Sequence, residues 1–139
     1  MNAFGRGSFA IGAALMLSSC STAPAEYTRT AEAQQELNKA LAGHVAGKPI
    51  NCIPNYRATD MHVIDDWTIL FESGRTIYLQ TPRGGCPGID TQRNTLVTRL
   101  TGTTQLCSGD IHELVDLPLG MRSGSCVFGP FVPYTKTAG

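Results

Sequence analysis

Five cysteines constrain this chain more than any other feature of its sequence. Cys20 follows an apolar N-terminal segment, and the other four, Cys52, Cys86, Cys107 and Cys126, are spread through the remainder. None of the four belongs to a Cys-x-x-Cys pair, which argues against a thioredoxin-like redox site or a zinc ribbon. An even number of cysteines in an exported domain indicates disulfides, so the first question is whether the chain is exported.

The first 19 residues have the composition of an export signal. Arg6 supplies a positive charge, and residues 9–17 form an almost wholly apolar run of the length typical of a signal peptide. This run is shorter than the roughly 20 apolar residues that a membrane-spanning helix requires. We therefore expect Met1–Ser19 to be removed during export.

Leu17-Ser18-Ser19-Cys20 resembles the lipobox of bacterial lipoproteins, in which an apolar residue and two small residues precede a cysteine. The resemblance implies that Cys20 is acylated and becomes the lipid-anchored first residue of the mature protein. Two or three acyl chains would hold it firmly, because each buried methylene contributes about 0.8 kcal/mol. Ser21 follows the cysteine, which by resemblance to Gram-negative lipoproteins favours the outer membrane, facing the periplasm. The alternative is an ordinary secretory signal with a chance cysteine.

Removal of the first 19 residues leaves 120 of the 139, enough for one domain. The removed segment carries Arg6 and no acidic residue, so 10 basic side chains remain against 11 acidic ones. The resulting net charge of −1, with no basic stripe, makes nucleic acid and anionic lipid surfaces poor candidate partners. We expect residues 20–29 to form a tether and residues 30–136 to form a single domain.

A helix is predicted over residues 30–45. Thr30 can cap it, Leu37, Leu41 and Val45 recur at helical spacing, and Gly47 lies beyond its end. From Ile50 onward the pattern changes to that of strands. The clearest is a hairpin of residues 67–72 and 75–80. The first strand places Trp67, Ile69 and Phe71 on one of its faces, and the second places Ile77 and Leu79 on one of its faces. Further strands are predicted at residues 61–64, 95–100, 111–115, 125–128 and 131–134.

These short strands predict a mostly β domain, a small antiparallel barrel or sandwich stapled by two disulfides and preceded by one short helix. The last strand contains Pro133 and follows Pro130. Because proline cannot donate to a ladder, we expect this segment to be an edge strand or an extended strap. Phe131 and Tyr134 would then close the core, or alternatively form an aromatic ligand wall.

Three disulfide connectivities are possible for four cysteines. We expect Cys52 to pair with Cys126, joining the opening and closing strands, and Cys86 to pair with Cys107 in the middle of the domain. A four-cysteine metal site is the alternative. In the chain-entropy account, each such disulfide stabilises the fold by about 3 to 5 kcal/mol.

The cysteine frame also carries a family resemblance. It consists of Lys48-Pro49-Ile50-Asn51-Cys52-Ile53, Gly85-Cys86-Pro87, Leu106-Cys107-Ser108-Gly109-Asp110, and Gly124-Ser125-Cys126-Val127 with Phe131-Val132-Pro133-Tyr134. This frame is similar to that of a family of small exported proteobacterial proteins that carries only a domain-of-unknown-function label. The resemblance covers about residues 40–136 and implies an exported fold, with no assigned activity, substrate or catalytic residue.

Candidate chemical groups are few. His44 lies at the end of the predicted helix, and His62 and His112 lie in strands with no second histidine or acid at metal-ligand spacing except Glu113 and Asp110. A Ser108-His112-Asp110 triad could be drawn, but no nucleophile elbow surrounds Ser108. Asp65-Asp66 reads as a solvated turn, with weak calcium binding as the alternative. We assign no catalytic residue, metal or cofactor.

Asp110 is the most informative single carboxylate. It follows Gly109 and precedes a predicted strand, which favours a turn in which the side chain accepts a hydrogen bond from nearby backbone. A functional carboxylate facing Arg99 or a ligand is the alternative.

The absence of a catalytic motif favours a membrane-anchored envelope lipoprotein that acts as a non-catalytic binding or interaction module, with an envelope partner or a small ligand. A small periplasmic hydrolase or metal-dependent enzyme is the alternative.

Overall fold

The predicted hairpin is the centre of the fold. The computed structural model describes residues 26–99 and 102–138, so the export signal, Cys20 and the first part of the tether lie outside the described residues. Strands β4 (Thr68–Ser73) and β5 (Thr76–Gln80) pair in antiparallel register and reverse at Gly74, whose φ of +61° suits a glycine. The hairpin prediction is confirmed.

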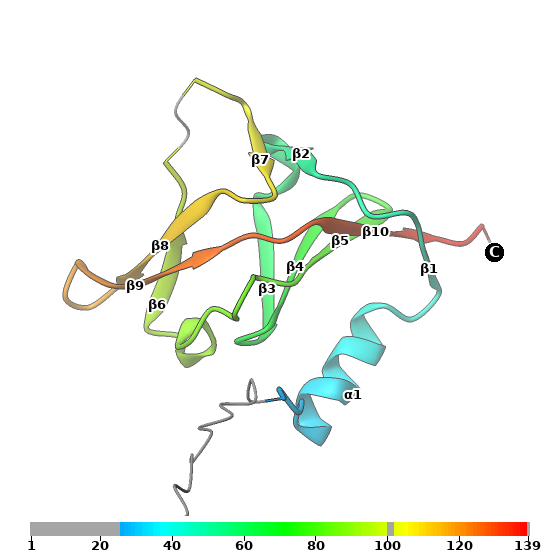
Figure 1. Ribbon diagram of the computed structural model, residues 1–139. Helices are drawn as coiled ribbons and strands as arrows, with labels where there is room; N and C mark the ends of the chain where they lie inside the picture. Colours follow the sequence, from blue (N-terminus) through cyan, green and yellow to red (C-terminus); the bar gives the residue numbers. More distant parts are fainter. Residues whose placement is uncertain (1–25, 100–101, 139) are drawn as a thin grey trace, which may run out of the picture.

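Five strands form the main antiparallel sheet, in the order β1-β10-β5-β4-β3 (Figure 1). Its other members are β1 (His44–Ala46), β3 (Asp60–Asp65) and β10 (Phe131–Lys136). Helix α1 (Ala31–Ala40) precedes the sheet in sequence and packs against it.

Two smaller antiparallel sheets complete the domain. One joins β2 (Cys52–Pro54) to β7 (Gln105–Cys107), and the other has the order β6-β8-β9. The members of the latter are β6 (Asn94–Val97), β8 (Ile111–Asp116) and β9 (Met121–Val127). Short 3-10 turns lie at η1 (Asn55–Arg57) and η2 (Ile89–Thr91). The expected mostly β antiparallel fold with one preceding helix is confirmed, and in the described part of the chain the sheets do not close into a barrel.

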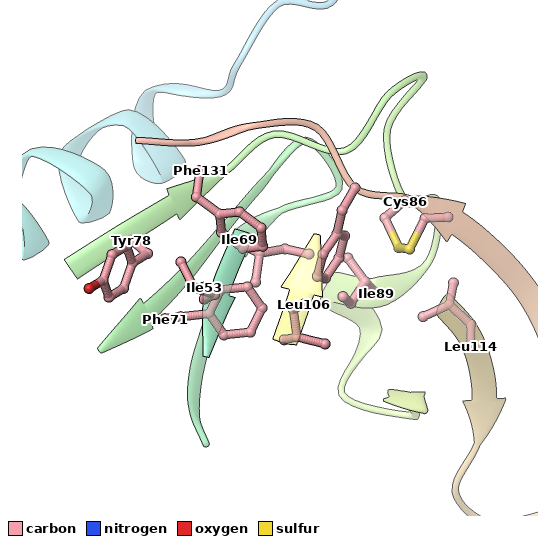
Figure 2. Close-up of a cluster of buried hydrophobic side chains, with 11 residues drawn as sticks. Ile53, Ile69, Phe71, Tyr78, Cys86, Ile89, Leu106, Leu114 and Phe131 are labelled. Atoms are coloured by element: carbon pink, nitrogen blue, oxygen red, sulfur yellow. A yellow bond between two sulfur atoms is a disulfide. The ribbon is translucent and has the colours of Figure 1, made fainter. Parts of the chain in front are cut away.

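Strand β4 is buried on both faces. Ile69 and Phe71 belong to the larger hydrophobic cluster, whereas Leu70 belongs to the smaller one beneath α1. Figure 2 shows Phe71, Ile53 and Leu106 near the centre of the larger cluster, with Leu114 and Cys86 to one side. Because successive side chains of a strand point to opposite faces, β4 contributes residues to both hydrophobic clusters.

The helix ends earlier than predicted. The Thr30 side chain accepts from the Ala33 N–H at 3.2 Å, as expected for a cap, but α1 ends at Ala40. Gly43 then adopts a φ of +73°, and Val45 lies in β1, paired with Thr135 of β10. The left-handed glycine and the available strand partner outweigh the helical spacing of Val45.

The closing strand is not at an edge. β10 lies between β1 and β5, so the prediction from its prolines is wrong. The Pro133 carbonyl accepts from the Gly47 N–H at 2.7 Å, beyond the end of β1. Because the N and C=O of one strand residue point to the same side, the missing Pro133 N–H faces that gap instead of β5. Phe131 is fully buried, which confirms core closure.

All four predicted cysteines form disulfides, but the expected pairing is wrong. The bonds join Cys52 to Cys107 and Cys86 to Cys126. Cys52 and Cys107 are direct partners across β2 and β7, with Cα atoms 4.0 Å apart. The loop that carries Cys86 runs beside β9, so its Cα lies 5.0 Å from that of Cys126. The expected pairing assumed that the opening and closing strands are neighbours, and they are not.

Non-reducing peptide mapping should therefore recover Cys52 linked to Cys107 and Cys86 linked to Cys126. The double variant Cys86→Ala/Cys126→Ala should lose about 4 kcal/mol of unfolding free energy, since the bond closes a separation of 40 residues. Denaturant unfolding measures this loss. A Cys52–Cys126 peptide would contradict the observed fold.

Candidate functional site

A hollow of about 330 Å³ opens where β8 begins. Its wall is contributed by the residues that follow β6, by the segment leading into β7 and by the β7–β8 turn. The lining residues are Thr98, Arg99, Thr103, Gly109, Asp110, Ile111 and His112. The hollow thus combines two hydroxyl groups with one carboxylate and one guanidinium.

His112 is the most unusual residue of this hollow, because its side chain is fully buried. Its Nδ1 lies 2.9 Å from Thr98 Oγ1, and its ring stacks on Phe128 with 3.7 Å between centroids. Nε2 has no hydrogen-bond partner among the described residues. Burial lowers the pKa of His112 below its ordinary value, and the negative charge of Asp110 opposes this only in part. Burial therefore favours the neutral form of the imidazole.

Asp110 occupies the turn that its sequence setting suggested. Its Oδ2 accepts from the Cys107 N–H at 2.7 Å, and Gly109 before it has a φ of +96°. The same turn is bonded to the core, because the Gly109 N–H donates to Phe128 O at 2.8 Å and the Phe128 N–H donates to Asp110 O at 3.0 Å. The carboxylate thus holds the turn and also lines the hollow.

The Ser-His-Asp arrangement considered from the sequence is not assembled. Ser108 Oγ accepts from Arg83 at 3.0 Å, whereas His112 contacts Thr98 and Asp110 contacts Cys107. Each of the three side chains has a structural partner of its own.

The other two histidines lie elsewhere. His44 Nδ1 donates to Ala42 O at 3.0 Å, and His62 Nε2 lies 2.7 Å from a Glu36 carboxylate oxygen. Within residues 26–99 and 102–138, no three acidic, histidine or cysteine side chains gather at metal-ligand distance.

Asp65 is not a solvated turn residue. It accepts from the Tyr27 hydroxyl at 2.6 Å and from Arg29 Nε at 2.7 Å. Burial raises the pKa of Asp65, but the hydrogen bonds from Tyr27, Arg29 and the Trp67 backbone outweigh it, so the pKa lies below its ordinary value. Tyr27 also stacks on Trp67, with centroids 5.0 Å apart. The last part of the expected tether is therefore clamped onto the domain.

Asp66 has a different environment from that of Asp65. Its Oδ1 accepts from the Gly88 N–H at 3.0 Å. Burial and the nearby charge of Asp90 raise its pKa.

Sequence reasoning missed Thr98 as the partner of His112. The register β6 to β8 pairs Val97 with Glu113, so Thr98 continues it opposite His112. Once that pairing is known the contact follows, but the sequence carries no local signal for it. Arg29 was likewise missed, since its partners Asp65 and Thr68 are 36 and 39 residues away.

Comparisons of this chain with protein-family models, with curated proteins and with solved structures returned no match. In the described residues, no helix has both the length and the apolar character needed to cross a bilayer.

The buried His112 makes stability depend on pH. Its folded pKa lies below the ordinary value of 6.5, so the unfolded chain takes up a proton first as the pH falls. The contribution of His112 to stability should be fully present above about pH 6.5 and should decline as the pH drops toward the folded pKa. Chemical denaturation between pH 8 and 5 measures this decline.

The double variant Thr98→Val/His112→Leu replaces both hydrogen-bonding partners with apolar groups and should flatten that pH dependence. His44→Gln, at a half-buried position on β1, is the control and should keep it. An unchanged slope in the double variant would show that another group is responsible.

Asp110→Asn keeps an acceptor for the Cys107 N–H and should cost little stability. Asp110→Ala leaves that partly buried donor unpaired and should cost about 1 kcal/mol or more. For a domain of this size, 1 kcal/mol corresponds to a fall of about 4 °C in melting temperature. If Asp110→Ala melts with the wild type but loses binding of a ligand, the carboxylate acts in recognition and the structural reading is wrong.

Proposed function

We propose that this chain is a lipid-anchored protein of the bacterial envelope, attached to the outer membrane through acylated Cys20. One observation carries the proposal: of five cysteines, four are paired within the fold, and the fifth follows Leu17-Ser18-Ser19 at the end of an apolar run. Disulfides are compatible with an oxidising compartment. The cysteine frame resembles that of small exported proteins, which supports the same location outside the cytoplasm.

The domain itself acts as a non-catalytic binding module. The groups that a hydrolase would use are engaged in structural bonds, and His112 is covered. The hollow beside them offers Arg99, Asp110 and the hydroxyls of Thr98 and Thr103. These groups suit a small polar ligand that presents both donors and acceptors. Arg99 is the adaptable member, because its side chain is exposed and, within the described residues, pairs with Glu113 alone at 3.3 Å.

Metabolic labelling with a palmitate analogue tests the anchor. The wild type should be labelled and should fractionate with the outer membrane, because two or three acyl chains hold a protein there durably. Cys20→Ala should lose both the label and the membrane association. Equal labelling of the two forms would refute the proposal.

The binding role is tested with the same lipidated protein, purified from its own envelope with bound small molecules and analysed by mass spectrometry. A ligand held in the hollow should be retained by the wild type and lost from Arg99→Ala. Arg75→Ala, an exposed arginine at the β4–β5 turn, is the matched control and should retain it.

A further inference from the structure

Three large apolar side chains are exposed together at the turn between β8 and β9. Leu117, Leu119 and Met121 are 59%, 65% and 64% exposed, and they fall within five consecutive residues. Single exposed hydrophobic residues are ordinary on a protein surface, but a contiguous group marks an interaction site. We call these three residues the apolar tip.

The backbone N–H groups of residues 117–120 are bonded within the domain. The N–H groups of Leu119 and Gly120 donate to the Asp116 side chain and carbonyl at 3.0 and 2.7 Å. The Leu117 N–H donates to Arg93 O at 2.7 Å, and Pro118 has no N–H. Every donor from 117 to 120 is thus satisfied within the domain. This matters most in a medium without water, where each unpaired donor is costly.

Two arginines stand behind the apolar tip. Arg93 Nη2 lies 2.8 Å from Asp116 Oδ2, and Arg122 Nη1 lies 3.6 Å from a Glu113 carboxylate oxygen. Both side chains remain more than half exposed. Guanidinium groups pair readily with phosphate oxygens. Two exposed arginines beside an apolar group therefore suit the lipid headgroup layer, which borders the apolar interior of a bilayer.

The apolar tip and the tether lie along one margin of the domain. Tyr27 stacks on Trp67, and the neighbouring Asp66 accepts from Gly88. Asn94 in turn donates to the Gly88 carbonyl at 2.8 Å and is paired with Asp116, where the β8–β9 turn begins. Figure 1 shows the same sequence of segments, with the β8–β9 turn at the left, η2 below it and the start of α1 beyond.

We propose that the apolar tip inserts into the boundary between headgroups and acyl chains of the bilayer that carries the lipid anchor. This inference rests on the proposed anchoring at Cys20. The seven residue steps from Cys20 to Tyr27 span at most about 25 Å, so the margin that carries the apolar tip stays near the membrane. Because the chain has a net charge near zero, apolar burial supplies the attraction and the arginines orient it.

The unacylated chain from residue 20 onward, with Cys20→Ser, tests the inference without the anchor. It retains both hydrophobic clusters and both disulfides. It should co-float with vesicles of phosphatidylcholine, whose headgroup carries no net charge. Leu119→Ser should weaken partitioning about tenfold, as expected when one leucine no longer enters the apolar phase. Val45→Ser, at an exposed valine on β1, is the matched control and should bind as the wild type does.

A reporter variant gives a second measurement. Trp67 is the only tryptophan of the chain, so Trp67→Phe with Leu119→Trp places a single fluorophore at the apolar tip. Its emission should shift to the blue on adding vesicles and should be quenched by brominated lipids.

Unacylated wild type that ignores vesicles would overturn the inference, even if labelling of Cys20 upholds the anchor. Concentration-dependent dimers lost in Leu119→Ser, without vesicle binding, would overturn it in favour of a second copy of the chain. Vesicle binding without labelling of Cys20 would uphold the insertion and reject the anchor.

Discussion

The fold depends on one crossing, where the chain leaves β9 in the three-stranded sheet and enters β10 in the five-stranded sheet. Gly129 lies at this crossing, and both of its backbone groups bond to the buried Gln80 side chain, at 2.8 and 2.9 Å. A Cβ at Gly129 would lie 2.5 Å from Thr81 O, so no side chain fits there. Both polar atoms of the buried Gln80 amide are hydrogen-bonded, and the pair of bonds fixes the position of one sheet on the other.

The aromatic residues on either side of this crossing connect the core to the hollow. Phe128 and Phe131 meet edge to face with 5.8 Å between centroids, and both lie against Phe71 of β4. Phe128 also stacks on His112, and its backbone holds the Asp110 turn. The polar hollow is therefore supported directly by the aromatic core. A rigid support of this kind suits recognition by preformed groups, because little ordering entropy is lost on binding.

Local signals in the sequence identified much of the fold. The β4–β5 hairpin followed from alternating residues and a glycine turn, and Thr30 identified the start of α1. Partners distant in sequence were not identified, because pairing between distant strands leaves no local pattern. The Cys52–Cys107 pairing required the unforeseen β2–β7 ladder. The position of β10 inside the sheet could not be predicted from its prolines alone. It depends on the nitrogen of Pro133 facing away from β5, which the sequence does not show.

The same distinction applies to the candidate site. The turn role of Asp110 could be predicted from the sequence, because a glycine followed by an aspartate favours a turn whatever the rest of the fold. The burial of His112 was not, because it depends on Phe128 and Thr98, which come from other segments. The exposed state of Leu117 and Leu119 was also hidden, since apolar residues in a strand-rich chain read equally well as core.

Strand β8 separates the two surfaces that carry the proposals. The hollow is at Ile111, where the strand begins, and the apolar tip follows Asp116, where it ends. The six residues of β8 span about 17 Å. If the apolar tip enters the bilayer as proposed, the hollow lies at the end of β8 that is farther from the membrane. In these two proposals, membrane insertion and ligand binding use opposite ends of one short strand, so neither obstructs the other.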